Sequence, residues 1–239
     1  MIINSKNNPK IKDFIKLKQK KYRNQARQFL VEGLHLVQEA KEAGLLEQVF
    51  VSKKSDYFEF SKKLIVSDEV IEALSELNTP QPIIGVSTYK KDQKIGSKVL
   101  YLDAIQDPGN IGTIIRLSRS FDIDTVIVKN FDIYNSKVLR ATQGAFFHQN
   151  IIQVKDNITL QSLAKSGYQV IATNLDKTAK TLNEVRFADK FVIIMGNEGV
   201  GVSQEVLKIA TEQLYIPISF ESLNVATATA IILNKVRNG

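Results

Sequence analysis

The spacing of apolar positions changes near residue 90, and this change divides the chain into two parts. Upstream, the apolar runs are short and alternate with polar positions: Phe29–Val31, Gln48–Val51, Leu64–Val66 and Ile83–Val86. Downstream, the runs are continuous: Val99–Leu102, Thr125–Val128, Gln169–Ala172, Phe191–Met195 and Leu214–Ile216. Continuous runs that alternate with helical stretches are typical of strands buried on both faces of a parallel sheet. We therefore predict an α/β fold, with a small α/β domain over 1–90, a polar linker over 91–98, and a second domain over 99–239 with a mostly parallel sheet.

Three helices are predicted in the first ninety residues. Pro9 can open a helix whose apolar face contains Ile11, Phe14, Ile15 and Tyr22. A second helix begins at about Leu34 and ends at Gly44, because glycine readily adopts the left-handed conformation that ends helices. Ser67 is expected to cap a third helix, with a buried stripe of Val70, Ile71, Leu74 and Leu77.

Unusual polar loops follow three of the buried runs. They span 103–112, 196–201 and 216–226, and the second contains three glycines but matches neither a phosphate-binding loop nor GxGxxG. In open parallel sheets, ligands bind beyond the carboxyl ends of the strands, so these loops are candidate site loops. Each loop taken singly is also consistent with ordinary helix caps, namely Asn110, Ser203, and Ser222 or Asn224.

Composition removes several classes of chemistry. The chain of 239 residues has no cysteine and two histidines, His35 and His148, so we expect no disulfide, thiolate chemistry or metal centre. It begins without a signal-like leader, and no apolar run approaches the roughly 20 residues that cross a bilayer. These features predict a cytoplasmic protein with no membrane partner.

The net charge of +7 is concentrated in the first 28 residues. This segment has one acid, Asp13, and nine basic residues: Lys6, Lys10, Lys12, Lys16, Lys18, Lys20, Lys21, Arg23 and Arg27. Its charge is therefore +8, whereas the remainder, with 23 basic and 24 acidic residues, is near −1. Such a segment is typical of a surface that binds phosphates, but a lysine-rich helix face that only aids solubility is equally consistent with the pattern.

Taken together, the loop segments resemble the motifs of the TrmH/SpoU family of SPOUT RNA methyltransferases. In order, they read LDAIQDPGNIGTIIRLSRSF at 102–121, IIMGNEGVGVS at 193–203 and IPISFESLNVATATAI at 216–231. FLVEG at 29–33 and TPQPIIGV at 79–86 resemble the substrate-binding domain often attached to this family. The resemblance implies a C-terminal trefoil-knot domain, a homodimer formed through that domain, and transfer of a methyl group from S-adenosylmethionine to a ribose 2′-hydroxyl in RNA.

The resemblance also implies which residues form the site. The cofactor-binding positions are Thr173, Asn174, Leu175, Gly196, Asn197, Gly199, Ile216, Leu223 and Asn224. The catalytic positions are Arg116, Asn110, Glu198, Ser222 and Asn224, with Arg116 acting either as a base or, as we prefer, as a cation that stabilises developing alkoxide charge. Glu198 either orients Arg116 or Asn110 or shapes its own loop. Expected RNA contacts are Lys10, Lys12, Lys16, Lys18, Lys20, Lys21, Arg23, Arg27, Arg119 and Arg140.

Other assignments remain open from the sequence. Phe146 and Phe147 are either core residues or a platform for a base. Ser219-Phe220 replaces the small-residue turn that is usual in the third motif. The N-terminal domain resembles those of ribosomal-RNA enzymes, and this resemblance favours ribosomal RNA over transfer RNA as the substrate. A non-catalytic RNA-binding protein with the same fold, or an enzyme acting on a base or a small molecule, are the alternatives.

Overall fold

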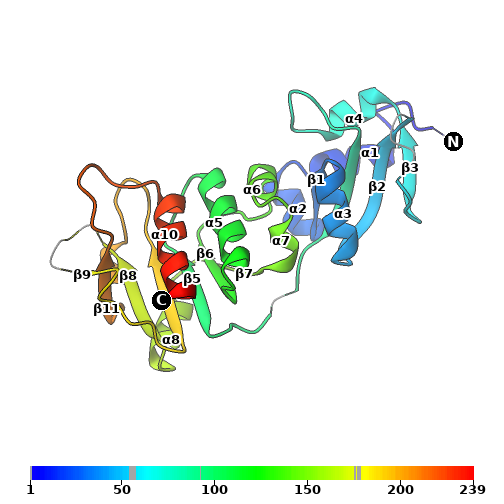
Figure 1. Cartoon of the computed structure of the whole chain (residues 1–239). Helices are drawn as coiled ribbons and strands as arrows, with labels where there is room; N and C mark the ends of the chain where they lie inside the picture. The colour runs from blue at the N-terminus through cyan, green and yellow to red at the C-terminus, as the bar shows by residue number, and fades with distance from the viewer. Residues whose placement is uncertain (1, 54–57, 92, 175, 177–178) are drawn as a thin grey trace. The chain divides into compact units, whose positions relative to one another are not determined.

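The computed structural model describes residues 2–53, 58–91, 93–174, 176 and 179–239 (Figure 1). Two compact units divide the chain. The first unit contains Met1–Lys91 and Tyr134–Phe147, and the second contains Asp92–Ile133 and His148–Gly239. Each unit has its own sheet.

The first unit is built on a four-stranded sheet of order β1-β4-β2-β3. Its strands are β1 (Gln28–Glu32), β2 (Leu46–Ser52), β3 (Lys63–Val66) and β4 (Ile83–Thr88). β4 is antiparallel to both β1 and β2, whereas β2 and β3 are parallel. The accompanying helices are α1 (Pro9–Lys16), α2 (Lys20–Ala26), α3 (Leu34–Glu42) and α4 (Asp68–Leu74). The predicted strands and the left-handed stop at Gly44, with φ +69°, are confirmed.

Two helix predictions in this unit are wrong in detail. The helix expected from Pro9 through Tyr22 is two helices, and the buried Arg23 explains the break between them. Its guanidinium donates to the carbonyls of Leu17 and Lys18 at 3.0 and 2.8 Å, and thereby satisfies groups that the end of α1 leaves without helical partners. α4 ends at Leu74, so Leu77 is not part of its stripe. Ser67 precedes α4, but its hydroxyl donates to the carbonyl of Asn4.

The segment Tyr134–Phe147 belongs to the first unit, although the sequence assigned it to the second domain. It contains α6 (Ser136–Ala141) and most of α7 (Ala145–His148). The buried ring of Phe29 lies 4.9 Å from that of Tyr134 and 5.7 Å from that of Phe146, centroid to centroid. Phe146 and Phe147 are both buried, which confirms that they are core residues. Aromatic packing thus joins this segment to the N-terminal sheet.

The second unit contains a seven-stranded sheet of order β7-β6-β5-β10-β8-β11-β9 in which every pairing is parallel. The strands are β5 (Lys98–Leu102), β6 (Thr125–Lys129), β7 (Asn150–Val154), β8 (Gln169–Thr173), β9 (Lys180–Thr181), β10 (Phe191–Met195) and β11 (Glu212–Tyr215). The predicted α/β class with a mostly parallel sheet is confirmed. The two edge strands, β7 and β9, were not predicted, because their exposed positions interrupt the apolar runs.

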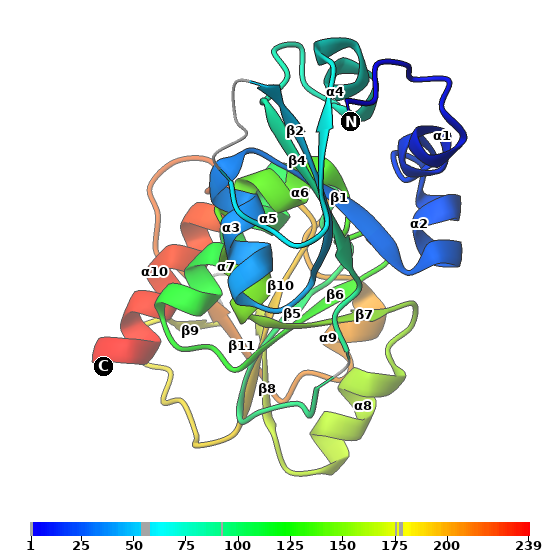
Figure 2. The same ribbon diagram turned by 90° about the vertical axis from the view of Figure 1, so that its right-hand side faces the viewer.

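Helices cover both faces of this sheet (Figure 2). α5 (Pro108–Ser120) and α10 (Val225–Asn238) lie side by side on one face, and α8 (Ile158–Lys165) and α9 (Gln204–Leu207) lie on the other. Leu160 of α8 and Val206 of α9 are fully buried against Val99, Tyr101 and Val192. Burial of a large aliphatic side chain contributes roughly 1.5–3 kcal/mol, so these contacts fix the helices on the sheet. Among the described residues, no helix is both long and apolar enough to span a bilayer.

The strand order brings the candidate loops together. β5, β10, β8 and β11 are consecutive neighbours in the sheet and all run in the same direction. Loops 103–107, 196–202 and 216–224 therefore leave the sheet at one carboxyl edge.

Candidate active site

A cavity of about 400 Å³ lies at this edge, within the second unit. Its volume is in the range of small-molecule sites, which is roughly 300–1,000 Å³. Seven predicted cofactor residues line it: Thr173, Asn174, Gly196, Asn197, Gly199, Ile216 and Leu223. Leu214 and Ile232 add apolar wall. Leu175 lies outside the described residues.

The loop after β10 folds back tightly on itself. Asn197 and Gly201 exchange backbone hydrogen bonds at 3.0 and 2.9 Å, and Gly201 has φ +71°. A Cβ on Gly196 would lie 2.3 Å from the Val202 nitrogen and 2.4 Å from the Gly201 carbonyl carbon. No side chain fits there, so glycine at 196 lets backbone form this wall of the cavity.

Asn197 connects this loop to the loop after β5. Its Oδ1 accepts from the backbone nitrogens of Gly199 and Val200, at 2.9 and 3.2 Å. Its Nδ2 donates to the carbonyl of Ala104 at 2.8 Å. Asn197 lines the cavity, but its amide is already engaged in holding the two loops.

Asp103 is a further residue of the site that was not predicted from the sequence, and its carboxylate supports the same two loops. It is 1% exposed and follows β5 directly. One carboxylate oxygen accepts from Nζ of Lys129 at 2.9 Å, and the other accepts from the nitrogen of Ser203 at 2.8 Å. A buried charge needs such partners. An acid at the end of an apolar run was the available signal.

Three of the predicted catalytic residues form one chain of hydrogen bonds. Nδ2 of Asn224 donates to Oδ1 of Asn110 at 2.9 Å, and Nδ2 of Asn110 donates to Oε1 of Glu198 at 2.9 Å. The direction is fixed at both ends: Oδ1 of Asn224 accepts from the nitrogens of Ala226 and Thr227, and an ionised carboxylate only accepts. The three loops that carry the motifs are thereby linked.

The caps of the two neighbouring helices follow from this arrangement. Asn224 caps α10, as predicted. Asn110 does not cap α5; Asp107 does, because its carboxylate accepts from the backbone nitrogen of Asn110 at 2.7 Å. Asn110 lies inside α5, which leaves its side chain available for the chain of hydrogen bonds. The predicted cap at Ser203 is also wrong in its chemistry, since Ser203 precedes α9 without a capping side-chain bond.

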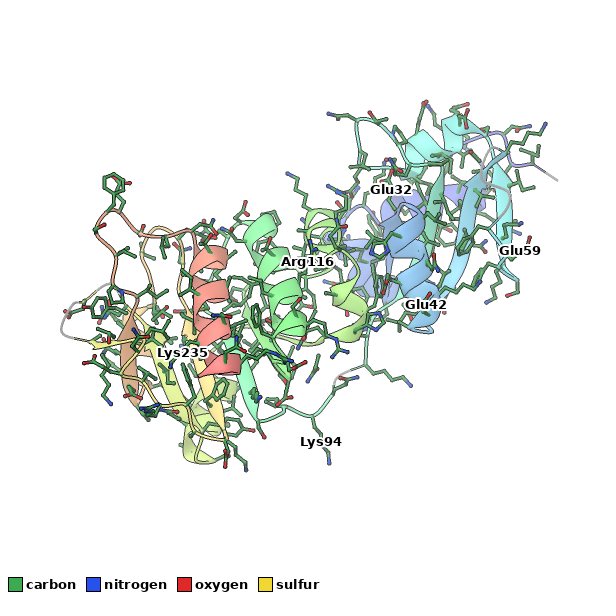
Figure 3. The ribbon with its side chains drawn as sticks, in the orientation of Figure 1. Glu32, Glu42, Glu59, Lys94, Arg116 and Lys235 are labelled. Carbon is green, nitrogen blue, oxygen red and sulfur yellow. The ribbon has the colours of Figure 1, made fainter. Side chains whose placement is uncertain are left out.

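Ser222 and Glu198 line the cavity, whereas Arg116 does not appear among the described residues that line it. Arg116 is exposed on α5 (Figure 3). It lies six residues beyond Asn110, and at about 100° per residue the two side chains leave the helix about 120° apart. Within a single chain, Arg116 is therefore not brought to the cavity.

The basic residues of the N-terminal segment differ in their surroundings. Arg23 is buried and bound to carbonyls, so the prediction that it contacts RNA is wrong. Lys16 pairs with Asp13 at 2.8 Å, and Lys18 is half-buried, with its pKa lowered by burial. The exposed cations of this segment are Lys6, Lys10, Lys12, Lys16, Lys20, Lys21 and Arg27. Arg119 is exposed in the second unit, and Arg140 is half-buried in the first.

Among the described residues, no three His, Asp or Glu side chains gather as a metal ion would require. Among the described residues that line the cavity, the titratable groups are the exposed Glu198 and the half-buried Tyr215. The buried pair of Asp103 and Lys129 supports the neighbouring loops but does not line the cavity.

Known proteins resemble the chain over nearly its whole length. The 23S rRNA (guanosine(2553)-2'-O)-methyltransferase RlmP of Bacillus subtilis is 36% identical over 98% of each chain. A crystal structure of an AdoMet-bound rRNA methyltransferase from Sinorhizobium meliloti is 28% identical, with a TM-score of 0.86 over 99% of this chain and 97% of that one. The SpoU methyltransferase AviRb from Streptomyces viridochromogenes, at 21% identity over 96% of this chain and 97% of its own and a TM-score of 0.86, shares the fold.

Family models match both parts of the chain. The MRM3-like substrate binding domain matches residues 8–85, and the SpoU rRNA Methylase family matches residues 97–234. The second match contains all three loops and the cavity. The chain therefore belongs to the SpoU rRNA methylase family.

Proposed function

We propose that the protein transfers a methyl group from S-adenosylmethionine to a ribose 2′-hydroxyl of ribosomal RNA. The observation that carries this proposal is the meeting of three separated segments beside one cavity, joined by the chain from Asn224 through Asn110 to Glu198. Family membership supplies the reaction class.

The cavity fits the cofactor. Bound S-adenosylmethionine supplies an electrophilic methyl group on its sulfonium. A Cβ on Gly196 would collide with the backbone of Gly201 and Val202. Because glycine has no Cβ, the backbone at this position can approach the ligand closely and read a purine edge. Ile216 and Leu223 offer apolar surface for the flat ring. The Sinorhizobium meliloti relative supports this assignment, because its structure was solved with AdoMet bound.

The polar residues at the mouth orient the nucleotide. The chain of hydrogen bonds directs the Asn110 amide toward Glu198, so Glu198 positions Asn110 rather than acting alone. Ser222 lines the cavity and has a hydroxyl that can accept from or donate to the ribose. These residues would orient the ribose 2′-hydroxyl at the mouth of the cavity.

Arg116 reaches the reaction from a second copy of the chain. A guanidinium stays protonated at ordinary pH, so its role is to bind phosphate and stabilise the developing alkoxide. Because Arg116 is exposed and is not among the described residues around its own cavity, we place it at the cavity of the partner subunit in a homodimer of knotted domains.

The substrate is assigned from the relatives and from charge. The Bacillus subtilis relative is named for a guanosine of 23S rRNA, and we propose the equivalent guanosine here. The exposed cations of the N-terminal segment contact the RNA backbone. We also propose a cytoplasmic location, which a ribosomal RNA substrate would support.

The test is incorporation of labelled methyl groups into RNA, followed by digestion to nucleosides. We expect a 2′-O-methylguanosine in 23S rRNA, and we expect the Arg116→Ala variant to lose at least about 100-fold in rate while its cofactor affinity is kept. Label on a base, or only in transfer RNA, would refute the substrate. Parental turnover by the variant would remove Arg116 from the mechanism. A protein that binds RNA but not the cofactor would be a non-catalytic member of the fold.

A further inference from the structure

Two apolar side chains at the site are almost fully exposed. Phe220 is 85% exposed and Val200 is 84% exposed, and they are the two most exposed large hydrophobic residues of the described chain. Val200 lines the cavity. Phe220 lies between Ile218 and Ser222, which both line it. The two most exposed large apolar side chains of the described residues therefore lie beside the same cavity.

The ring of Phe220 has no packing role within the described chain. No other described aromatic ring is recorded in contact with it, and it is absent from the buried cores of both units. An exposed aromatic ring beside a nucleic-acid site is the usual platform for a base.

We propose that Phe220 stacks on the nucleobase of the nucleotide that is methylated. This inference rests on the proposed function and adds a residue that positions the substrate. Two residues of extended chain span at most about 7 Å, so the Cα atom of Phe220 lies within that distance of the Cα atom of Ser222. This is comparable with the separation between a ribose hydroxyl and the base of the same nucleotide. A ring at this position can therefore hold the base while the hydroxyl faces the cavity.

The neighbours of Phe220 favour a base over the other occupants of such a surface. Ser219 and Glu221 are exposed, so the apolar surface is a single ring between polar residues. The carboxylate of Glu221 repels phosphate, whereas the face of a base is uncharged.

The chain contains no tryptophan, so the Phe220→Trp variant gains a single fluorescent reporter at this position. The probe is an RNA hairpin copied from the 23S segment that contains the proposed guanosine. With S-adenosylhomocysteine present, we expect this RNA to quench the fluorescence, because stacking brings the indole against the base. The same hairpin without a base at that nucleotide is the control and should quench little. Equal quenching by both hairpins, or emission that is already shielded from solvent without RNA, would overturn the proposal.

Activity gives a second readout. Phe220→Tyr keeps the ring and should keep kcat/KM for RNA, whereas Phe220→Leu keeps only apolar surface and should lower it by roughly 5- to 100-fold. Cofactor affinity should be the same in both variants, which controls for misfolding of the loop. If Phe220→Leu methylates at the parental rate, the stacking role fails and the proposed function stands. If the parent does not methylate the RNA, the proposed function itself fails.

Discussion

Gly196 determines the shape of one wall of the cavity. A methyl group there would collide with the backbone of Gly201 and Val202, and the loop would have to open. Overpacking of this kind costs typically 1–3 kcal/mol, so we expect Gly196→Ala to weaken cofactor binding by about tenfold or more. Calorimetry with S-adenosylmethionine measures this.

Gly199 offers the matched comparison for folding. A Cβ there would meet only Oδ1 of Asn197, at 3.5 Å, so Gly199→Ala should unfold at the parental temperature. If Gly196→Ala bound the cofactor as tightly as the parent, the close backbone approach would not matter for binding.

Lys90 is predicted to make stability depend on pH. Burial lowers its pKa from 10.5 to about 8, while its Nζ donates to the carbonyl of Phe146 at 2.8 Å. Between these two pH values the unfolded chain binds the proton more strongly, so the free energy of unfolding rises with pH. Relative to Lys90→Met, the parent should gain on the order of 2 kcal/mol from pH 8 to pH 10. Urea unfolding at several pH values tests this, and a difference that does not change with pH would contradict it.

The sequence predicts single residues well where a motif marks them, and poorly where distant contacts decide. Gly196, Asn224 and Glu198 were predicted from motif matches, and the structure brings them to one site. Asp103 was missed because its partners, Lys129 and Ser203, are remote in the chain. Arg23 was assigned to RNA because charge is visible in a sequence, whereas its burial depends on how α1 and α2 pack.

At the level of helices, Asn224 has two separable roles. Its Oδ1 caps α10 by accepting from two backbone nitrogens, and its Nδ2 donates to Asn110. Asn224→Asp keeps the cap acceptor and loses the donor, so we expect near-parental stability with strongly reduced methyl transfer. Asn224→Ala loses both and should also lose about 1 kcal/mol of stability. Thermal unfolding and turnover of the two variants distinguish the roles, and equal turnover of Asn224→Asp and the parent would exclude the donor.

The elements themselves were predicted most reliably where both faces are buried. The central strands β5, β6, β8 and β10 are continuous apolar runs, and all were predicted. β7 and β9 lie at the sheet edges, where partners on one side only leave a mixed pattern. Periodicity likewise could not reveal that one amphipathic stretch forms two helices, because a buried arginine from α2 closes the end of α1.

At the scale of the whole molecule, we predict that the exposed lysines of the N-terminal segment bind RNA without taking part in catalysis. We expect replacement of Lys10, Lys12, Lys20 and Lys21 by glutamine to weaken RNA binding and to reduce the dependence of affinity on salt, because fewer counterions are released. Affinities measured between about 50 and 200 mM salt give the slope. Replacement of Lys94, Lys165 and Lys190 in the second unit is the control and should leave it unchanged. If the glutamine variant keeps the parental dependence of RNA affinity on salt, those lysines only aid solubility.

The division into two parts was visible in the sequence, but the extent of each part was not. The change in apolar spacing near residue 90 indicates a boundary. The first of the two chain segments that form the first unit ends at Lys91. The return of Tyr134–Phe147 to that unit depends on aromatic contacts with Phe29, which join residues over a hundred positions apart. The domain limits drawn from sequence remain a prediction that limited digestion can test.

The packing of Tyr134–Phe147 within the first unit has a practical consequence for work with separate fragments of the protein. An isolated N-terminal fragment that ends at the linker would lack the rings of Tyr134 and Phe146 that pack on Phe29, so it should expose apolar surface and bind a dye such as ANS. A chimaera that exchanges recognition modules among relatives would have to transplant two stretches of sequence together. Insertions and deletions in one stretch would therefore disturb the packing of the other.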